Sequence, residues 1–194
     1  MMLAVSGLVI GLIVVAVILL FAIFWFIGAY NGLVRFRNEV KNAWAQIDVQ
    51  LKRRWDLIPN LVETVKGYTK HEAETLQKVT EARNIAQGAA GQGVAAQAEA
   101  ESMLSGALSR LMVVVEAYPD LKANQNYLAL QEELTSTENK IGYSRQYYND
   151  TVMKFNTRQQ MFPTNVVAGM FNFKISEFFE LKDEAAREAP KVEF

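Results

Sequence analysis

The chain has 194 residues, of which 51% are hydrophobic and 21% charged, with a formal net charge of −1. This length allows one domain with its own core and one additional segment. Cysteine is absent, which excludes disulfides and cysteine–zinc sites, and no basic block is dense enough to predict a nucleic-acid surface. The few prolines and the frequent Ala, Leu, Gln and Glu favour a mostly helical protein.

The first strong feature is an uncharged apolar stretch, "LAVSGLVIGLIVVAVILLFAIFWFIGAY", at residues 3–30. About 20 apolar residues are enough for a helix to cross a bilayer. The alternative is a cleavable signal peptide, which has a basic start and an apolar core of only roughly 7–15 residues. Because this stretch starts without charge and is longer, residues 1–32 are predicted to be an uncleaved transmembrane anchor.

The end of the apolar stretch has the composition of a membrane interface. Trp25 and Tyr30 suit the aromatic belt at one membrane surface. Arg35, Arg37 and Lys41 follow within the window that sets orientation, whereas the N-terminal flank offers no basic side chain. The positive-inside rule therefore predicts an external N-terminus and a cytoplasmic location for the rest of the chain.

Two glycine pairs have the GxxxG spacing that lets membrane helices approach closely. Gly7 and Gly11 lie inside the apolar stretch, where they are candidates for packing between anchors. Gly28 and Gly32 mark the exit from the bilayer instead. Because membrane helices are rich in glycine, this spacing is only weak evidence for self-association.

A long amphipathic helix is predicted to follow over residues 33–66. Its apolar positions recur every three or four residues, at 33, 36, 40, 44, 47, 51, 55, 58, 61 and 65. This stripe keeps its phase across Pro59, which favours one helix kinked at that residue. The alternative is a new helix capped by Asp56, with Pro59 in its first turn. In the first case, the missing N–H of Pro59 leaves the Trp55 carbonyl without its helical donor.

Three further helices are predicted over 70–87, 94–118 and 124–158. Thr69 and Glu72 have the spacing of a capping box before the first of them. "GAAGQG" at 88–93 is a turn, and Pro119 ends the next helix. Long helices joined by short turns predict an all-α fold, in which a transmembrane helix precedes an up-and-down four-helix bundle over 33–158.

Residues 159–194 form a predicted C-terminal extension, rich in phenylalanine, at the membrane-proximal end of the bundle. Its candidate contact residues are Phe162, Phe171, Phe173, Phe178 and Phe179. These rings either close the end of the bundle or contact lipid or a neighbouring subunit. Lys154, Arg158 and Lys174 lie in the same region and extend a basic collar suited to anionic lipid.

The sequence offers no recognisable active site, and we predict no catalytic, metal-binding or cofactor-binding residues. The single histidine, His71, lies in "HEAET", which lacks the second histidine of a zinc-protease helix. The carboxylate pairs Glu99/Glu101 and Glu132/Glu133 are typical of solvated helix faces. "TENK" at 137–140 and "YYND" at 147–150 are polar clusters on a long helix and are candidate binding faces. The chain is therefore not expected to be an enzyme.

Several stretches together resemble the LemA family of bacterial membrane proteins. They are "YNGLVRFRNEVKNAWAQIDVQLKRRWDLIPNLVETVKGY" at 30–68, "TEARNIA" at 80–86, "AYPDLKANQNYLALQEELTSTENKIGYSRQYYNDTVMKFN" at 117–156 and "FPTNVVAGMF" at 162–171. The resemblance implies a single-pass protein of the bacterial plasma membrane with a four-helix bundle. It implies no catalytic residues, and the link of some relatives to magnetosome membranes implies membrane organisation.

Two functions follow as hypotheses. The first is a membrane-anchored helical scaffold that assembles laterally as a homo-oligomer and organises the lipid bilayer or its proteins. The alternative is an adaptor that docks another membrane protein, such as a protease or a signalling partner, on its polar helix faces.

Overall fold

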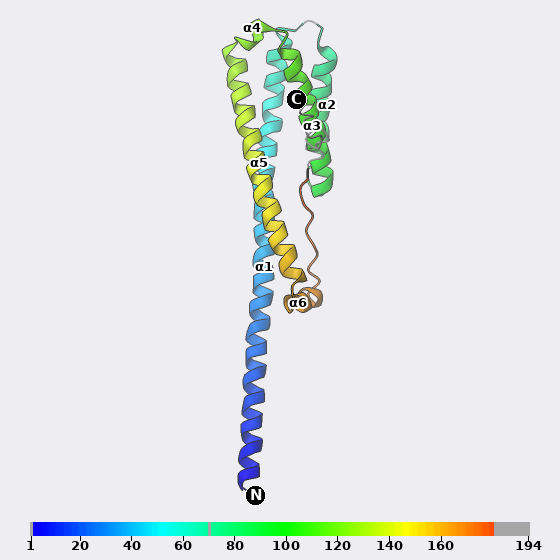
Figure 1. Ribbon diagram of the computed structural model, residues 1–194. Coiled ribbons are helices and arrows are strands. Elements are labelled where there is room, and N and C mark those ends of the chain that lie inside the picture. Colours follow the sequence, from blue (N-terminus) through cyan, green and yellow to red (C-terminus); the bar gives the residue numbers. More distant parts are fainter. Residues whose placement is uncertain (1, 70, 181–194) are drawn as a thin grey trace, which may run out of the picture. The chain divides into compact units, whose positions relative to one another are not determined.

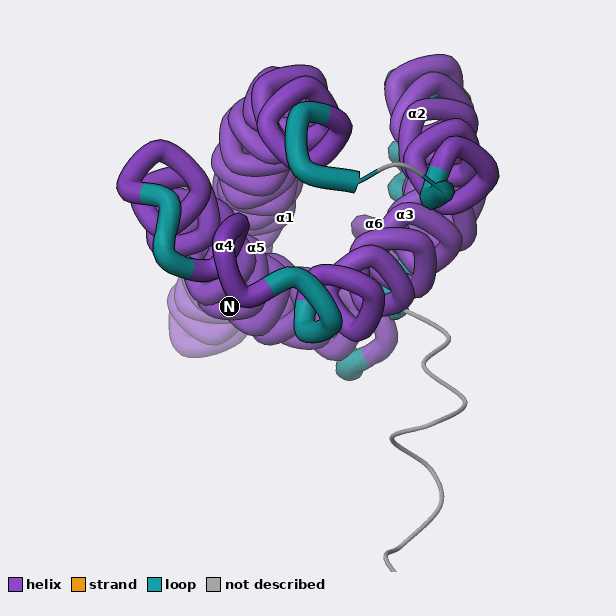
Figure 2. The backbone as a smooth tube through the Cα atoms, turned by 90° about the horizontal axis from the view of Figure 1, so that it is seen from above, coloured by secondary structure: helices purple, strands orange, loops and turns teal. Residues whose placement is uncertain are grey.

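The computed structural model describes residues 2–69 and 71–180 of the chain (Figure 1). Every regular element in these residues is a helix, as Figure 2 also shows. The elements are α1 (Met2–Lys66), α2 (Ala73–Gly88), α3 (Val94–Val115), α4 (Pro119–Lys122), α5 (Gln125–Gln160) and α6 (Thr164–Met170). The predicted all-α class is therefore confirmed.

Helix α1 is one uninterrupted helix of 65 residues. It joins the apolar stretch to the amphipathic stretch without a break, and it continues through Pro59. The alternative of a new helix capped by Asp56 is therefore wrong. One proline removes a single helical hydrogen bond, and the apolar face on both sides of it is buried, which holds the helix together.

The chain divides into two compact units that share α1 and α5. One unit contains the chain up to Lys41 together with Thr151–Ser176. The other contains Asn42–Asp150 and the chain from Glu177 onward. Contacts thus divide α1 after Lys41, inside the range that the sequence assigned to the bundle.

In the larger unit, several helices contribute buried apolar side chains. Buried side chains recur along α1 at Ile47, Leu51, Ile58, Leu61 and Val65. The other helices add Leu76 and Val79 from α2, Leu104 and Leu111 from α3, and Leu134 and Ile141 from α5. Each fully buried side chain of this size contributes about 1.5–3 kcal/mol. The stripe that predicted the helix is therefore the face that holds this unit together.

Side-chain contacts show the relative direction of α1 and α5 in this unit. Trp44 packs against Tyr148 with ring centroids 5.3 Å apart, and Arg53 forms an ion pair with Glu133. Since α1 ascends from 44 to 53 while α5 descends from 148 to 133, the two helices are antiparallel. Helices α2 and α3 pack against each other (Figure 1).

The chain after α6 returns to this unit and is held by side chains of α5. The Asn149 amide accepts from the Phe179 N–H at 2.9 Å and donates to the Phe179 carbonyl at 3.2 Å. The Tyr148 hydroxyl donates to the Glu177 carbonyl at 2.9 Å. The Phe179 ring packs on Trp44 at 5.5 Å, so residues 177–179 close part of the core.

Tyr148 should make this closure sensitive to alkali. Burial, followed by the charge of Glu177, raises the pKa of Tyr148 from 10.0 to about 12. The folded state thus holds a proton that the unfolded state releases near pH 10. Its contribution is complete below pH 10 and is lost as the pH rises toward 12. We expect Tyr148→Phe to cost about 1 kcal/mol at pH 8 and less at pH 11.5. Chemical unfolding of both proteins at each pH measures this difference, and a pH-independent difference would contradict the expectation.

Helix ends differ from the sequence prediction in three places. The predicted capping box is absent: the Thr69 hydroxyl donates to the Val65 carbonyl, and Glu72 makes no side-chain cap to α2. Helix α3 ends at Val115, before Pro119, and Pro119 begins the separate short helix α4. Proline is favoured in a first turn because its missing N–H has no helical partner there. Helix α5 extends to Gln160, slightly beyond the predicted end.

Candidate membrane-interface site

The apolar stretch of α1 is exposed along the whole described length of its side chains. From Ile10 to Ile27 every large side chain except Phe26 is exposed, and Phe21 and Phe24 expose 76% and 72% of their surface. Among the described residues, α1 is the one helix long and apolar enough to cross a membrane. A water-exposed surface of this kind is unfavourable for a soluble protein, whereas lipid covers it at no such cost.

Aromatic rings mark the end of this exposed stretch. Trp25 is 42% exposed, as expected for a belt residue. Tyr30 is half-buried, because the Phe171 ring lies 4.6 Å and the Phe173 ring 6.0 Å from it. Phe26 also contacts Phe171 at 5.9 Å. Rings from the segment that follows α6 therefore contact Tyr30, one of the two residues predicted to form the aromatic belt.

Basic side chains follow directly on α1. Arg35, Arg37 and Lys41 are all exposed. The guanidinium of Arg37 lies 5.2 Å from the centre of the Phe173 ring. Arg35 lies 5.6 Å from the Phe36 ring and pairs with Glu39 at 3.5 Å. Cations over aromatic faces beside an apolar helix are suited to a membrane surface, where lipid phosphates are available to them.

A polar contact holds the aromatic segment in place. Asn156 on α5 donates to the Ser176 carbonyl at 2.8 Å and accepts from the Ser176 N–H at 2.9 Å. Phe155, next to it, is buried and meets Phe173 at 6.4 Å. The segment that contains Phe171 and Phe173 is thus attached to α5 by a pair of hydrogen bonds between the Asn156 side-chain amide and the Ser176 backbone.

The five candidate phenylalanines have different environments. Phe162 exposes 82% of its surface and Phe171 49%, while Phe173 is half-buried between α1 and α5. Phe178 is exposed in the other unit. Phe179 is 1% exposed and belongs to the core with Trp44. The five rings therefore do not share one role. Phe179 closes a core, whereas Phe162 is exposed enough to contact lipid or a neighbouring subunit.

The glycines proposed for packing between anchors lie on an open face of α1, as far as their surroundings are described. At Gly11 an added Cβ would meet no heavy atom within 4 Å, so this face of α1 is open. Gly7 lies within α1 but outside the residues whose side-chain surroundings are described. His71 is exposed, and the described residues contain no group of three or more His, Cys, Asp or Glu that could hold a metal ion.

Comparison with known proteins decides the family. The model of the LemA family matches residues 43–194, which is most of the chain. The chain belongs to the LemA family. Protein LemA of Metamycoplasma hominis is 31% identical over 170 residues, covering 85% of this chain and 77% of that protein. Magnetosome protein MamQ 2 of Paramagnetospirillum magneticum and magnetosome protein MamQ of Magnetospirillum gryphiswaldense are 25% and 24% identical over 177 residues. These two alignments cover 79% of this chain and 65% of each relative.

A buried charge cluster in this LemA-family chain escaped the sequence analysis. Arg54 on α1 is 1% exposed and forms an ion pair with Glu101 on α3, which is also 1% exposed. Its other terminal nitrogen donates to Glu138 on α5 at 2.7 Å and to the Ser105 hydroxyl at 3.1 Å. Arg54 therefore connects three helices. The prediction that Glu101 lies on a solvated face is wrong.

Glu101 is saturated by further donors. Its second oxygen accepts from the indole N–H of Trp55 at 2.9 Å and from the Gln97 amide at 2.8 Å. A buried carboxylate is tolerated only when it is paired and hydrogen-bonded in this way. The sequence did contain a signal for this pair. Arg54 lies three residues after Leu51 and Glu101 three residues before Leu104, so each charge lies on the apolar face of its helix.

The proline on α1 has a partner from another helix. Pro59 has no N–H to give the Trp55 carbonyl, and Arg83 on α2 donates its Nε–H to that carbonyl at 2.8 Å. The sequence predicted that this carbonyl lacks its helical donor, but it did not predict that Arg83 supplies another. Thus Pro59 creates an acceptor that α2 uses to dock on α1.

Proposed function

We propose that this chain is a membrane-anchored helical scaffold whose copies associate side by side. The observation that carries the proposal is α1: one helix begins as an exposed apolar surface and continues, without a linker, into the core of a charged helical unit. Relatives named as magnetosome proteins support a role in organising a membrane compartment.

We further propose that α1, α2, α3 and α5 form an up-and-down four-helix bundle on the cytoplasmic side. The antiparallel contacts of α1 with α5 and the packing of α2 on α3 support this arrangement. The exposed basic residues after the apolar stretch support the orientation. A reporter fused after Phe194 is expected to be active in the cytoplasm of a bacterial host, and periplasmic activity would refute the orientation.

Lateral association has candidate surfaces in the smaller unit. Gly11 leaves an open face on the anchor. Near α6, Phe162, Val166 and Met170 expose 82%, 53% and 67% of their surfaces. An exposed apolar surface of this extent on one short segment needs a cover of lipid or protein. The proposal assigns the chain no catalytic step.

The mass of the full chain in native nanodiscs tests the proposal. We expect several copies in one particle, with a distribution that persists on dilution. Gly11→Leu fills the open face of the anchor and should shift the distribution to smaller particles, whereas Ala16→Leu enlarges a residue on another face of the same helix and serves as the control. A wild-type chain that is monomeric at all concentrations would refute the scaffold.

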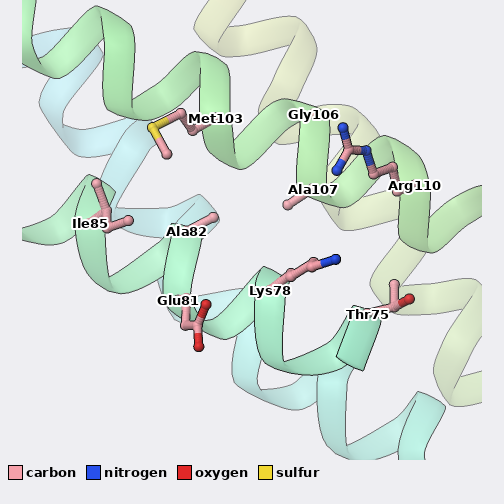
Figure 3. A pocket seen from close by; sticks show the side chains of 9 residues that line it. All are labelled: Thr75, Lys78, Glu81, Ala82, Ile85, Met103, Gly106, Ala107 and Arg110. Carbon is pink, nitrogen blue, oxygen red and sulfur yellow. The ribbon is translucent and has the colours of Figure 1, made fainter. Parts of the chain in front are cut away.

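An adaptor is the second candidate, because the described residues of the larger unit form open grooves on its helices, two of which offer exposed side chains for a partner. One is a groove of about 710 Å³ along α5, where Tyr143 exposes 74% of its surface beside Asn139 and Lys140. The other lies between α2 and α3, where Ile85 and Met103 face the same space with Lys78 and Arg110 nearby (Figure 3). Crosslinking from Asn139 should then capture one partner at defined stoichiometry. Capture of only other copies of the chain would favour the scaffold.

A further inference from the structure

A groove of about 840 Å³ lies in the smaller unit, between positions 28–36 of α1 and positions 153–158 of α5, with Met161 just after α5. Its lining positions recur every three or four residues on each helix, so each helix presents one face to it. The groove begins at Gly28, immediately after Ile27, the last residue of the exposed apolar stretch. In a chain anchored as proposed, it therefore lies at the level of the lipid headgroups.

The groove is lined by cations and no carboxylate. Arg35, Lys154 and Arg158 line it, and the neutral donors Asn31 and Thr157 lie between them. Within residues 2–69 and 71–180, Lys154 and Arg158 form no ion pair. Arg35 pairs with Glu39 at 3.5 Å, but its side chain is 72% exposed, so this pair is weak. Such a set of donors matches the oxygens of a phosphate.

The remaining lining is apolar or small. Met153 and Met161 are each 53% exposed, and Gly28 and Gly32 line the same groove. At Gly28 and Gly32 an added Cβ would meet no heavy atom within 4 Å, so the glycines leave room along α1. A flexible methionine beside an open glycine face accommodates a hydrocarbon chain. Charged donors and apolar surface thus occur in one groove.

We propose that this groove binds one anionic phospholipid from the cytoplasmic leaflet. Its phosphate lies among Arg35, Lys154 and Arg158, and an acyl chain follows the glycine face of α1 toward the apolar stretch. The inference rests on the proposed membrane anchoring. It goes beyond that proposal because it assigns one lipid to one groove, whereas a basic collar would attract anionic lipids without a defined site or number. Anionic lipid is the favoured occupant because it supplies both the phosphate and the hydrocarbon that the lining matches.

Native mass spectrometry of the full chain, released from nanodiscs of equal parts phosphatidylglycerol and phosphatidylcholine, tests the site. We expect one phosphatidylglycerol to be retained per chain in preference to phosphatidylcholine. In the double variant Lys154→Gln/Arg158→Gln this preference should fall about 10- to 30-fold, since each cation near the surface contributes roughly one factor of five.

Two further variants separate the groove from the collar. Lys41→Gln/Lys174→Gln removes the same charge from exposed positions of the same unit that do not line the groove, and it should retain the lipid. Gly32→Leu leaves the charge unchanged, fills the groove and should lose the lipid; it also replaces a poor helix former by a good one, so α1 is expected to stay folded.

Three results would overturn the proposal. Equal loss of lipid in the two double variants would show that the basic collar as a whole, and not the groove, selects phosphatidylglycerol. Retention in Gly32→Leu would place the lipid elsewhere. A change of oligomer mass in Gly32→Leu, with no retained lipid in the wild type, would assign the groove to a second copy of the chain. Failure of the wild type to enter nanodiscs at all would instead refute the membrane anchoring on which the inference rests.

Discussion

Removing the charge of Glu101 is expected to destabilise the folded chain by about 3–5 kcal/mol, because the buried Arg54 then keeps only the half-exposed Glu138 as a charged partner. Glu101→Gln preserves the size of the side chain, so the loss reports charge and hydrogen bonding and no cavity. The Arg54→Ala variant should cost at least as much, since Glu101 then keeps its charge in the core. The apparent free energy of unfolding of the full chain in detergent, followed by circular dichroism in urea, measures both changes.

The neighbouring residue on α1 supplies a matched control. Arg53 also pairs with a glutamate, Glu133, but their side chains are 52% and 41% exposed. Arg53→Ala should therefore cost no more than about 1 kcal/mol. Arg54→Lys should fall between the two, because a lysine keeps the charge but cannot contact Glu101, Glu138 and Ser105 together. Equal effects of Arg53→Ala and Glu101→Gln would show that burial does not determine the strength of these pairs.

The second large effect is a coupling between Pro59 and Arg83. Arg83→Met should destabilise the chain by about 1–3 kcal/mol, because the Trp55 carbonyl loses its donor. In a Pro59→Ala background the backbone N–H of residue 59 returns to supply that carbonyl, so the same substitution should cost less. A double-mutant cycle is expected to give a coupling energy of about 1–2 kcal/mol.

Pro59→Ala alone is expected to stabilise α1, since Pro59 is exposed and proline is unfavourable inside a helix. An exposed arginine on α3, Arg110, serves as the control. Arg110→Met should show no coupling to Pro59→Ala. If Arg83 and Pro59 were also uncoupled, the hydrogen bond from Arg83 to the Trp55 carbonyl would have no energetic significance.

Periodicity predicted the helices because each has a face that must be buried. The stripe from Leu33 to Val65 is buried at nearly every position, and it correctly indicated that Pro59 interrupts no helix. Local signals were less informative. Thr69 has the sequence of a cap, but its hydroxyl bonds back to the Val65 carbonyl, and the sequence does not show which acceptor is closer.

The buried polar contacts were harder to predict because they depend on which helix faces which. Arg54 continues the inner stripe of α1, four residues before Ile58, and Glu101 continues that of α3. Considered separately, Arg54 and Glu101 look like charged residues at the edge of an apolar helix face. Only the packing of α1 against α3 shows that they meet. Phe179 is buried by the same kind of long-range contact, through Asn149 and Trp44, which lie on two different helices.

Direct imaging of the full chain in lipid membranes by electron cryo-microscopy tests the central claim of a laterally assembling scaffold most directly. The measurement is the number of copies in contact per particle. The scaffold predicts several copies whose apolar α1 segments lie side by side in the bilayer. Isolated single copies, or one copy bound to a different protein, would contradict it.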